Sequence, residues 1–402
     1  MKSFISILLL ALTLVAGSQP KSPILRIEPG MHTSKGYKIS ADAEGKFLLS
    51  ASIDKTARFW DASTGTLLKT FRIPIGGTGE GTLYSCSLSP DGRIAALSGA
   101  TGFEWDNAGC IYLINTQTGA IINRIKNLPS VILDLEFSPD GNWLAATFSG
   151  NNGVYVFDTR GWGEYKRLAG YTKEVTSIAF KPGGGLATVS ADGKIRLYNS
   201  SFEKINERTG VEGQLAYCLA FNPGGDLLAV GYLSAASVEV RNAADLSVQY
   251  KPAAAEEEGG GFSSLCFSSD GSSLYGGASF RKFVREENKW KQFVRRWNNA
   301  GRGSYTDLLL IDNSIADMKS LRSGSMAVIG FDPPDIAVLN ASDKVSWYLS
   351  AQKNDFTSRD KSHLRINNNG SSIGFTPLGQ RAYSFNILQK TLCRKSLYTL
   401  PP

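Results

Sequence analysis

The chain has 402 residues, a formal net charge of +7 and only two histidines, His32 and His363. So few histidines argue against a zinc or iron centre with imidazole ligands and against most histidine-based acid–base catalysis. A charge of +7 over this length is modest and favours an anionic partner such as lipid, cell wall or nucleic acid only slightly, so nucleic acid is not the expected partner.

The first expected element is a secretory signal peptide at residues 1–18. Lys2 precedes an apolar run at 4–15, small residues follow, and cleavage is expected near Ser18. The apolar run is short for a membrane span, although a retained anchor stays open as the alternative. We therefore expect an exported protein, periplasmic or extracellular, with no integral membrane segment after cleavage. The remaining residues, 19–402, are expected to form a single domain.

From residue 37 onward, short apolar runs alternate with turns, and most units contain four such runs. The turn glycines at positions 45, 92, 141, 184, 225, 271, 324 and 370 lie 41 to 53 residues apart. A period of about 45 residues with four short strands per unit is typical of an all-β propeller, in which each unit is one blade. The units cover 37–71, 83–125, 132–169, 175–208, 215–251, 262–310, 315–349 and, most weakly, 363–386.

Eight units favour an eight-bladed propeller, with seven blades plus a C-terminal extension as the alternative. A propeller must close, because open strand edges invite aggregation. We expect terminal-strand closure, in which the apolar run at 24–28 supplies the outer strand of the eighth blade.

Five cysteines occur in the chain, at spacings that fit neither a disulfide framework nor a metal-binding motif. Four of them lie in predicted strands, where buried free thiols are expected. A bridge between Cys86 and Cys110 within one predicted blade stays open. We expect no metal and no cofactor.

The first unit contains LLSASIDKTARFWD at residues 48–61, which resembles the WD40 repeat signature. The resemblance implies a hydrogen-bonded structural set formed by His32, Ser52 (or Ser50), Asp54 and Trp60. A carboxylate and an indole beside an imidazole satisfy polar groups that would otherwise be buried unpaired. We therefore expect a structural role for this set and no catalytic residue.

The order of five segments resembles the propeller region of bacterial caspase-family proteins. The segments are GMHT, SASIDKTARFWD, GGTGEG, TGFEWDNAG and RRWNNAGRG. In that family a WD40-type propeller accompanies a caspase-like protease domain. No such domain is recognised here, and no cysteine has the surroundings of its nucleophile. The resemblance implies no protease activity, but it makes a separate caspase-like protease one expected partner.

Three long connections are predicted on one face of the propeller, at 73–82, 100–109 and 280–291. With the strands of a blade lettered a to d in chain order, this face carries the b–c and d–a connections. The short SPDG-type turns are a–b connections and lie on the other face. Long loops in a compact domain are often functional.

The last two of these connections hold the candidate partner-binding residues, in which aromatic side chains alternate with charged ones. Aromatic and arginine side chains are the usual anchors of protein interfaces. Alternatively, Trp105 folds back over its own blade, and the second set belongs to a two-stranded extension of blade six with solvated basic side chains. The candidates are Phe103, Glu104, Trp105, Asp106, Arg281, Lys282, Arg285, Lys289 and Trp290.

We therefore expect an exported, non-catalytic scaffold that binds another protein through this loop face. One alternative is a propeller that binds envelope glycans or other small ligands through the mouth of its central channel. A second is a propeller enzyme, hydrolase or quinoprotein-like, which is disfavoured because no carboxylate pair stands out by its spacing. The sequence does not predict the oligomeric state.

Overall fold

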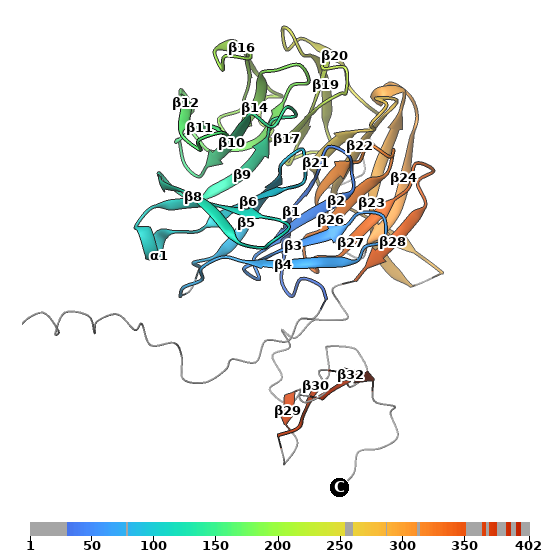
Figure 1. Ribbon diagram of the computed structural model, residues 1–402. Coiled ribbons are helices and arrows are strands. Elements are labelled where there is room, and N and C mark those ends of the chain that lie inside the picture. Colours follow the sequence, from blue (N-terminus) through green and yellow to red (C-terminus); the bar gives the residue numbers. More distant parts are fainter. Residues whose placement is uncertain are drawn as a thin grey trace, which may run out of the picture. The chain divides into compact units, whose positions relative to one another are not determined.

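The computed structural model describes residues 30–77, 79–253, 260–286, 288–311 and 314–350, together with short stretches between 364 and 394. The chain folds into antiparallel four-stranded sheets whose strands follow one another in sequence (Figure 1). The first four sheets contain β1 (Gly36–Ala41), β2 (Phe47–Ser52), β3 (Thr56–Asp61), β4 (Leu67–Arg72), β5 (Thr82–Leu88), β6 (Ile94–Ala100), β7 (Gly109–Asn115), β8 (Ile121–Leu128), β9 (Ile132–Phe137), β10 (Trp143–Phe148), β11 (Val154–Asp158), β12 (Glu164–Leu168), β13 (Val175–Phe180), β14 (Leu186–Ser190), β15 (Lys194–Tyr198) and β16 (Lys204–Thr209).

Three further sheets continue the same pattern, and a fourth follows them. Their strands are β17 (Ala216–Phe221), β18 (Leu227–Tyr232), β19 (Val238–Asn242), β20 (Val248–Tyr250), β21 (Phe262–Phe267), β22 (Ser273–Val284), β23 (Lys289–Asn298), β24 (Tyr305–Ile311), β25 (Ile315–Ser320), β26 (Met326–Gly330), β27 (Ile336–Leu339), β28 (Val345–Leu349), β29 (Leu364–Ile366), β30 (Ser372–Phe375), β31 (Tyr383–Asn386) and β32 (Thr391–Arg394). Among the described residues, two short helices, α1 (Phe103–Asp106) and η1 (Asn299–Gly301), lie in the connections.

The first seven sheets are the blades of a closed ring. Their innermost strands contact one another in turn, and β25 and β26 of the seventh blade contact β1 of the first. One apolar cluster fills each interface between neighbouring blades. The cluster between the last and first blades joins Ile329 and Ile336 to Trp60. The protein is therefore a seven-bladed β-propeller.

The prediction of eight blades is wrong. Strands of the predicted eighth unit exist as β29 to β32, but they pair with one another in a separate sheet. The ring closes without them, because the Gly36 N–H donates to Phe331 O at 2.8 Å and Trp347 Nε1 donates to Ala62 O at 2.9 Å. Each blade uses four consecutive strands, so the terminal-strand closure is wrong as well. Residues 24–28, and the predicted signal peptide at 1–18, lie outside the described residues.

The a–b turns form a rim around the centre of the ring. Gly141 in the turn of the third blade has φ 74°, which glycine adopts at little cost because it has no Cβ. Ser138 Oγ donates to Asp140 Oδ1 at 2.5 Å and accepts from the Trp143 N–H at 2.9 Å, which fixes the turn. A Cβ at Gly141 would lie 3.6 Å from Pro90, so neighbouring turns pack closely.

Candidate functional site

Blade one contains a buried network of hydrogen-bonded polar side chains at the position of the WD40 signature. Trp60 Nε1 donates to Ser50 Oγ at 2.9 Å, and His32 Nε2 lies 2.8 Å from the same oxygen. His32 Nδ1 lies 3.1 Å from Asp54 Oδ2. Ser50 therefore occupies the place between His32 and Trp60. Ser52 lies beside the network, where its Oγ donates to Ser34 O at 2.8 Å and accepts from the Asp54 N–H at 3.0 Å.

The electrostatics of Asp54 agree with a structural role. Burial opposes its ionisation, but His32 and the hydrogen bonds from Thr56 and the Thr33 N–H outweigh burial and hold the pKa of Asp54 below its usual range. Thr56 Oγ1 donates to Asp54 Oδ1 at 2.6 Å. The carboxylate is thus committed to contacts within the fold.

Blade four has a buried hydrogen-bonded set at the same positions, formed by different side chains. Tyr171 and Tyr198 stand where blade one has His32 and Trp60, and their hydroxyl oxygens lie 2.9 Å apart. Burial raises the pKa of both tyrosines. The Arg196 guanidinium lies 4.2 Å from the centre of the Tyr171 ring and donates to Asp192 Oδ2 at 2.7 Å. Both blades therefore use these positions to satisfy buried polar groups.

Glu80 joins two of the predicted long connections through hydrogen bonds. Its carboxylate, on the 73–81 connection, accepts from the N–H groups of Gly102 at 2.5 Å, Phe103 at 3.0 Å and Glu104 at 3.3 Å. These N–H groups begin helix α1, and a helix leaves its first N–H groups without intrahelical partners. Glu80 is 5% exposed and is not among the residues predicted from the sequence.

The four candidates of α1 have different surroundings. Asp106 pairs with Arg124 and, at 3.1 Å, with Lys126, so its charge is used within blade two. Glu104 lies against Gly76, because a Cβ at that glycine would meet the Glu104 carboxylate. Phe103 is half-buried. Trp105 is 58% exposed, which makes its ring available to a partner.

The third predicted connection is an extended hairpin. Strands β22 and β23 have 12 and 10 residues, and their pairing continues to Val284 and Lys289. Phe283 and Trp290 are cross-strand partners whose ring centres lie 5.4 Å apart. The Arg281 guanidinium lies 4.8 Å from the centre of the Trp290 ring.

The outer part of this hairpin is exposed. Phe283 is 45% and Trp290 53% exposed, and Arg285 at the tip is also exposed. Lys282 and Lys289 are paired in register with Lys291 and Val284, and their side chains lie outside the described part of the structure. The candidates thus form two groups on the face of the b–c connections. One lies on blade two and the other on blade six, which are not adjacent.

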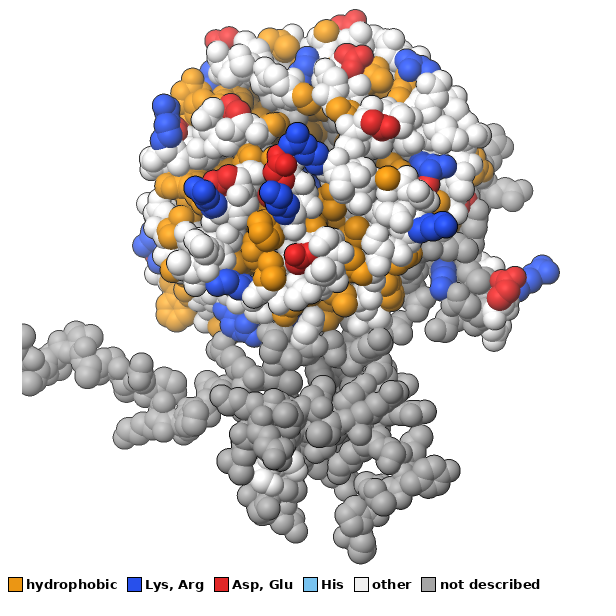
Figure 2. Space-filling view, turned by 45° about the vertical axis from the view of Figure 1, so that its right-hand side comes forward, with side chains coloured by type: hydrophobic (Ala, Val, Ile, Leu, Met, Phe, Trp, Pro, Cys, Tyr) orange, Lys and Arg blue, Asp and Glu red, His pale blue; other side chains and the backbone are white. Residues whose placement is uncertain are grey.

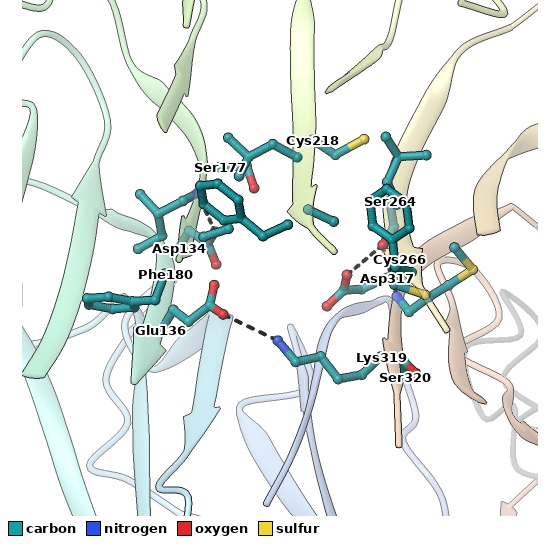
Figure 3. Close-up of a pocket in the computed structure, with 18 of the residues that line it drawn as sticks. Asp134, Glu136, Ser177, Phe180, Cys218, Ser264, Cys266, Asp317, Lys319 and Ser320 are labelled. Carbon is teal, nitrogen blue, oxygen red and sulfur yellow. Dashed lines mark hydrogen bonds and ion pairs between the residues drawn. The ribbon is translucent and has the colours of Figure 1, made fainter. Parts of the chain in front are cut away.

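A cavity of about 590 Å³ lies at the centre of the ring, at the channel that the small-ligand alternative invokes, although no site residue was predicted there. Figure 3 shows side chains of the innermost strands around this cavity. Residues of the a–b turns also line it, so it lies toward the face opposite the long connections. Figure 2 shows one face of the propeller, where hydrophobic side chains gather near the centre and charged side chains lie among them.

Charged side chains from three innermost strands meet in this cavity. Lys38 Nζ lies 2.8 Å from Asp134 Oδ1 and 3.8 Å from Asp317 Oδ2. Lys319 Nζ lies 3.4 Å from Glu136 Oε1. The signal in the sequence is the alternate spacing of Asp134 with Glu136 and of Asp317 with Lys319, because alternate residues of a strand share one face.

The two ends of the Glu136–Lys319 pair respond to this environment differently. Burial raises the pKa of Glu136, with Lys319 opposing the shift only in part. The negative charge of Glu136 raises the pKa of Lys319. The pKa of Lys38 is also raised, because Asp134 and Asp317 outweigh the effect of its burial.

Four cysteines of the blades lie in strands β5, β7, β17 and β21. Cys86, Cys110, Cys218 and Cys266 are free and buried, and burial raises the pKa of each, that of Cys266 to about 12. Among the described residues, no three His, Cys, Asp or Glu side chains are grouped so that they could hold a metal ion. The described helices are all too short or too polar to cross a lipid bilayer.

Comparison with known proteins agrees with this fold. The family model "WD domain, G-beta repeat" matches residues 32–61, 123–158 and 162–199. The first match covers the network of blade one, and the others lie in blades two to four. The chain therefore carries WD40 repeats on a β-propeller.

The chain is similar to several eukaryotic WD-repeat proteins. WD repeat-containing protein SL1-17 of Schistosoma mansoni is 29% identical over 163 residues, covering 40% of this chain and 49% of the relative. U3 small nucleolar RNA-associated protein 18 homolog of Mus musculus is 28% identical over 208 residues, covering 48% of this chain and 35% of the relative. Periodic tryptophan protein 2 of Arabidopsis thaliana is 26% identical over 270 residues, covering 66% of this chain and 26% of the relative.

The alignments thus span about half or less of the length of these relatives. The relatives give no support to the resemblance to bacterial caspase-family proteins, to a caspase-like protease as partner, or to an envelope role. What they share with this chain is the WD40 propeller, an architecture suited to binding other proteins.

Proposed function

We propose that this protein is a non-catalytic scaffold that binds another protein through the β22–β23 hairpin. The observation that carries the proposal is the exposed group of Arg281, Phe283 and Trp290 on a hairpin that extends beyond the usual strand length of the other blades. Exposed aromatic and arginine side chains that lie together are the common anchors of protein interfaces.

The geometry of this group favours binding because the side chains are already ordered. Phe283 and Trp290 pack edge to face, and Arg281 lies over the Trp290 ring. Association costs less when side chains need not be fixed at the moment of binding. The exposed Arg281 and Arg285 make an acidic surface the best complement on the partner.

The loop of Trp105 supplies a second contact on the same face. Glu80 fixes the loop to its neighbour, and Trp105 projects with 58% of its surface exposed. A partner that spans the face from blade two to blade six would contact both groups. The absence of catalysis is also part of the proposal, and it is supported by the structural use of His32 in blade one.

Export remains a separate proposal, which rests on the sequence of residues 1–18. The basic start and short apolar run are those of a signal peptide. Sequencing the N-terminus of the protein from its native source tests it. A mature chain that begins near residue 19 would support export, whereas an intact Met1 would overturn it.

Affinity capture with matched variants tests the proposed function. The Trp290→Ala variant should lose a protein that the unchanged chain captures, with affinity at least tenfold lower, because such anchors contribute about 2 kcal/mol or more. Ile205→Ala is the control, since Ile205 is 54% exposed on β16 and lies outside the hairpin. Equal capture by both variants would refute the hairpin as the contact. Capture of no protein, with Trp105 fluorescence quenched by added oligosaccharide, would favour the glycan-binding alternative.

A further inference from the structure

The central cavity has an apolar mouth on the a–b face. Pro139 and Pro223 in the turns of two blades are exposed, and Pro182 and Phe221 are half-exposed beside them. Phe180 lies next to Glu136 in Figure 3. A volume of about 590 Å³ lies within the range of sites for small molecules. The walls thus offer apolar contact around a charged interior.

The charges inside the cavity are unequal. Among the described residues that line it, Asp134, Glu136 and Asp317 face two ammonium groups, those of Lys38 and Lys319. Arg322 also lines the mouth, but it pairs with Glu44 outside the cavity. Three carboxylates and two ammonium groups leave one excess negative charge in a partly dehydrated site. Such a site attracts a cation.

The excess charge can be assigned to Glu136. Asp134 accepts from Lys38 at 2.8 Å and from the Ile178 N–H at 3.3 Å. Asp317 accepts from Ser264 Oγ at 2.9 Å and from the Ile39 N–H at 3.2 Å. Among the described contacts Glu136 has Lys319 at 3.4 Å, longer than the 2.7–2.9 Å typical of a charge-assisted hydrogen bond.

We propose that this cavity binds a small organic cation. Its protonated amine or amidine lies at the Glu136 carboxylate, and its apolar body lies against the proline and phenylalanine side chains of the mouth. Glu136 and Lys319 are on strands β9 and β25 of different blades, so the ligand would compete with a cation from across the ring. This site is independent of the proposed protein contact, which lies on the opposite face.

Calorimetric titration with three probes of one shape tests the inference. The probes are 2-phenylethylammonium, neutral 2-phenylethanol and anionic 3-phenylpropanoate. The ammonium should bind at least tenfold more tightly than either analogue, which corresponds to about 1.4 kcal/mol. Glu136→Gln should weaken ammonium binding at least tenfold, and Lys319→Met should strengthen it because a competing cation is removed.

Ile205→Ala is the control variant, because Ile205 is exposed on β16 and does not line the cavity, so its loss should leave the titration unchanged. Thermal unfolding of Glu136→Gln establishes that this variant is folded before it is titrated. Absence of ammonium binding, equal binding of the neutral probe, or unchanged affinity in folded Glu136→Gln would each overturn the proposal. These results would leave the hairpin proposal standing, and failure of the hairpin to bind protein would leave this one standing.

Discussion

The carboxylate of Glu80 accepts a hydrogen bond from the backbone N–H of Phe103 at 3.0 Å, which joins two connections of the propeller face. The same carboxylate serves the N–H groups of Gly102 and Glu104. The loop that presents Trp105 is therefore held by a residue that follows the preceding blade in the chain. Its order depends on one buried side chain rather than on the four residues of α1 alone.

Replacing Glu80 should loosen this loop. Glu80→Ala leaves three backbone donors without their acceptor, which should cost about 1–3 kcal/mol because buried donors lose their hydrogen bonds. Hydrogen exchange of the amides of residues 102–104 should become faster, while exchange in blades four and five stays unchanged. Glu212→Ala serves as the control, since Glu212 is exposed on another connection. Unchanged exchange at 102–104 would show that Glu80 does not hold the loop.

Stability in acid should depend on Asp54. Its pKa is lowered in the folded state, so its contribution to stability is present above the usual aspartate pKa of about 3.9 and is lost as the pH falls through the folded value. The unfolding temperature should therefore fall more steeply below pH 4 in the unchanged protein than in Asp54→Asn. Differential scanning calorimetry from about pH 2 to pH 6 measures both across the range in which the contribution is lost. Parallel curves would mean that Asp54 is not specially stabilised by His32 and Thr56.

Closure of the ring should be sensitive to Gly36. A Cβ at this residue would lie 2.7 Å from Gly330 O and 2.7 Å from Ile329 Cδ1, at the seam between blades one and seven. Gly36→Ala should destabilise the fold by about 1–3 kcal/mol through overpacking. Gly161→Ala is the matched control, because a Cβ there meets nothing within 4 Å. If denaturant titration finds both variants equally stable, the close packing of blades one and seven at Gly36 would be contradicted.

Ending the chain after residue 350 tests the count of blades. The first seven sheets close on themselves through β1 and β25, so the shortened chain should retain a cooperative unfolding transition. Circular dichroism during thermal unfolding measures the transition. Loss of cooperative unfolding would show that residues 351–402 are needed to complete the ring.

Local chemistry allowed the strands and turns to be predicted from sequence. Gly92 and Gly141 have φ of 72° and 74°, and each ends an SPDG turn between predicted strands. The count of blades could not be predicted in this way. A repeated turn identifies a four-stranded unit, but closure depends on long-range packing such as that of Trp60 against Ile336. Hence the weakest repeat was wrongly included in the ring.

Some of the site residues could likewise be predicted from the sequence and others could not. The resemblance of residues 48–61 to a WD40 repeat was sufficient to place His32, Asp54 and Trp60 near one another, but two serines of one strand face offered alternatives. The register puts Ser50 opposite Arg58, beside the indole, and leaves Ser52 near the end of the strand. Glu80 and Glu136 were missed because their partners are far from them in sequence.

Site-specific photo-crosslinking at position 283 tests the central claim most directly. A photoreactive phenylalanine analogue in place of Phe283 sits beside Trp290 on the exposed hairpin, and the same analogue at position 205 is the control. Irradiation in extracts of the native source should yield one discrete protein crosslink from position 283 and none from 205. The crosslink should disappear when Trp290 is also replaced by alanine. No discrete crosslink at 283, or the same crosslinks at both positions, would contradict a scaffold that binds its partner through the β22–β23 hairpin.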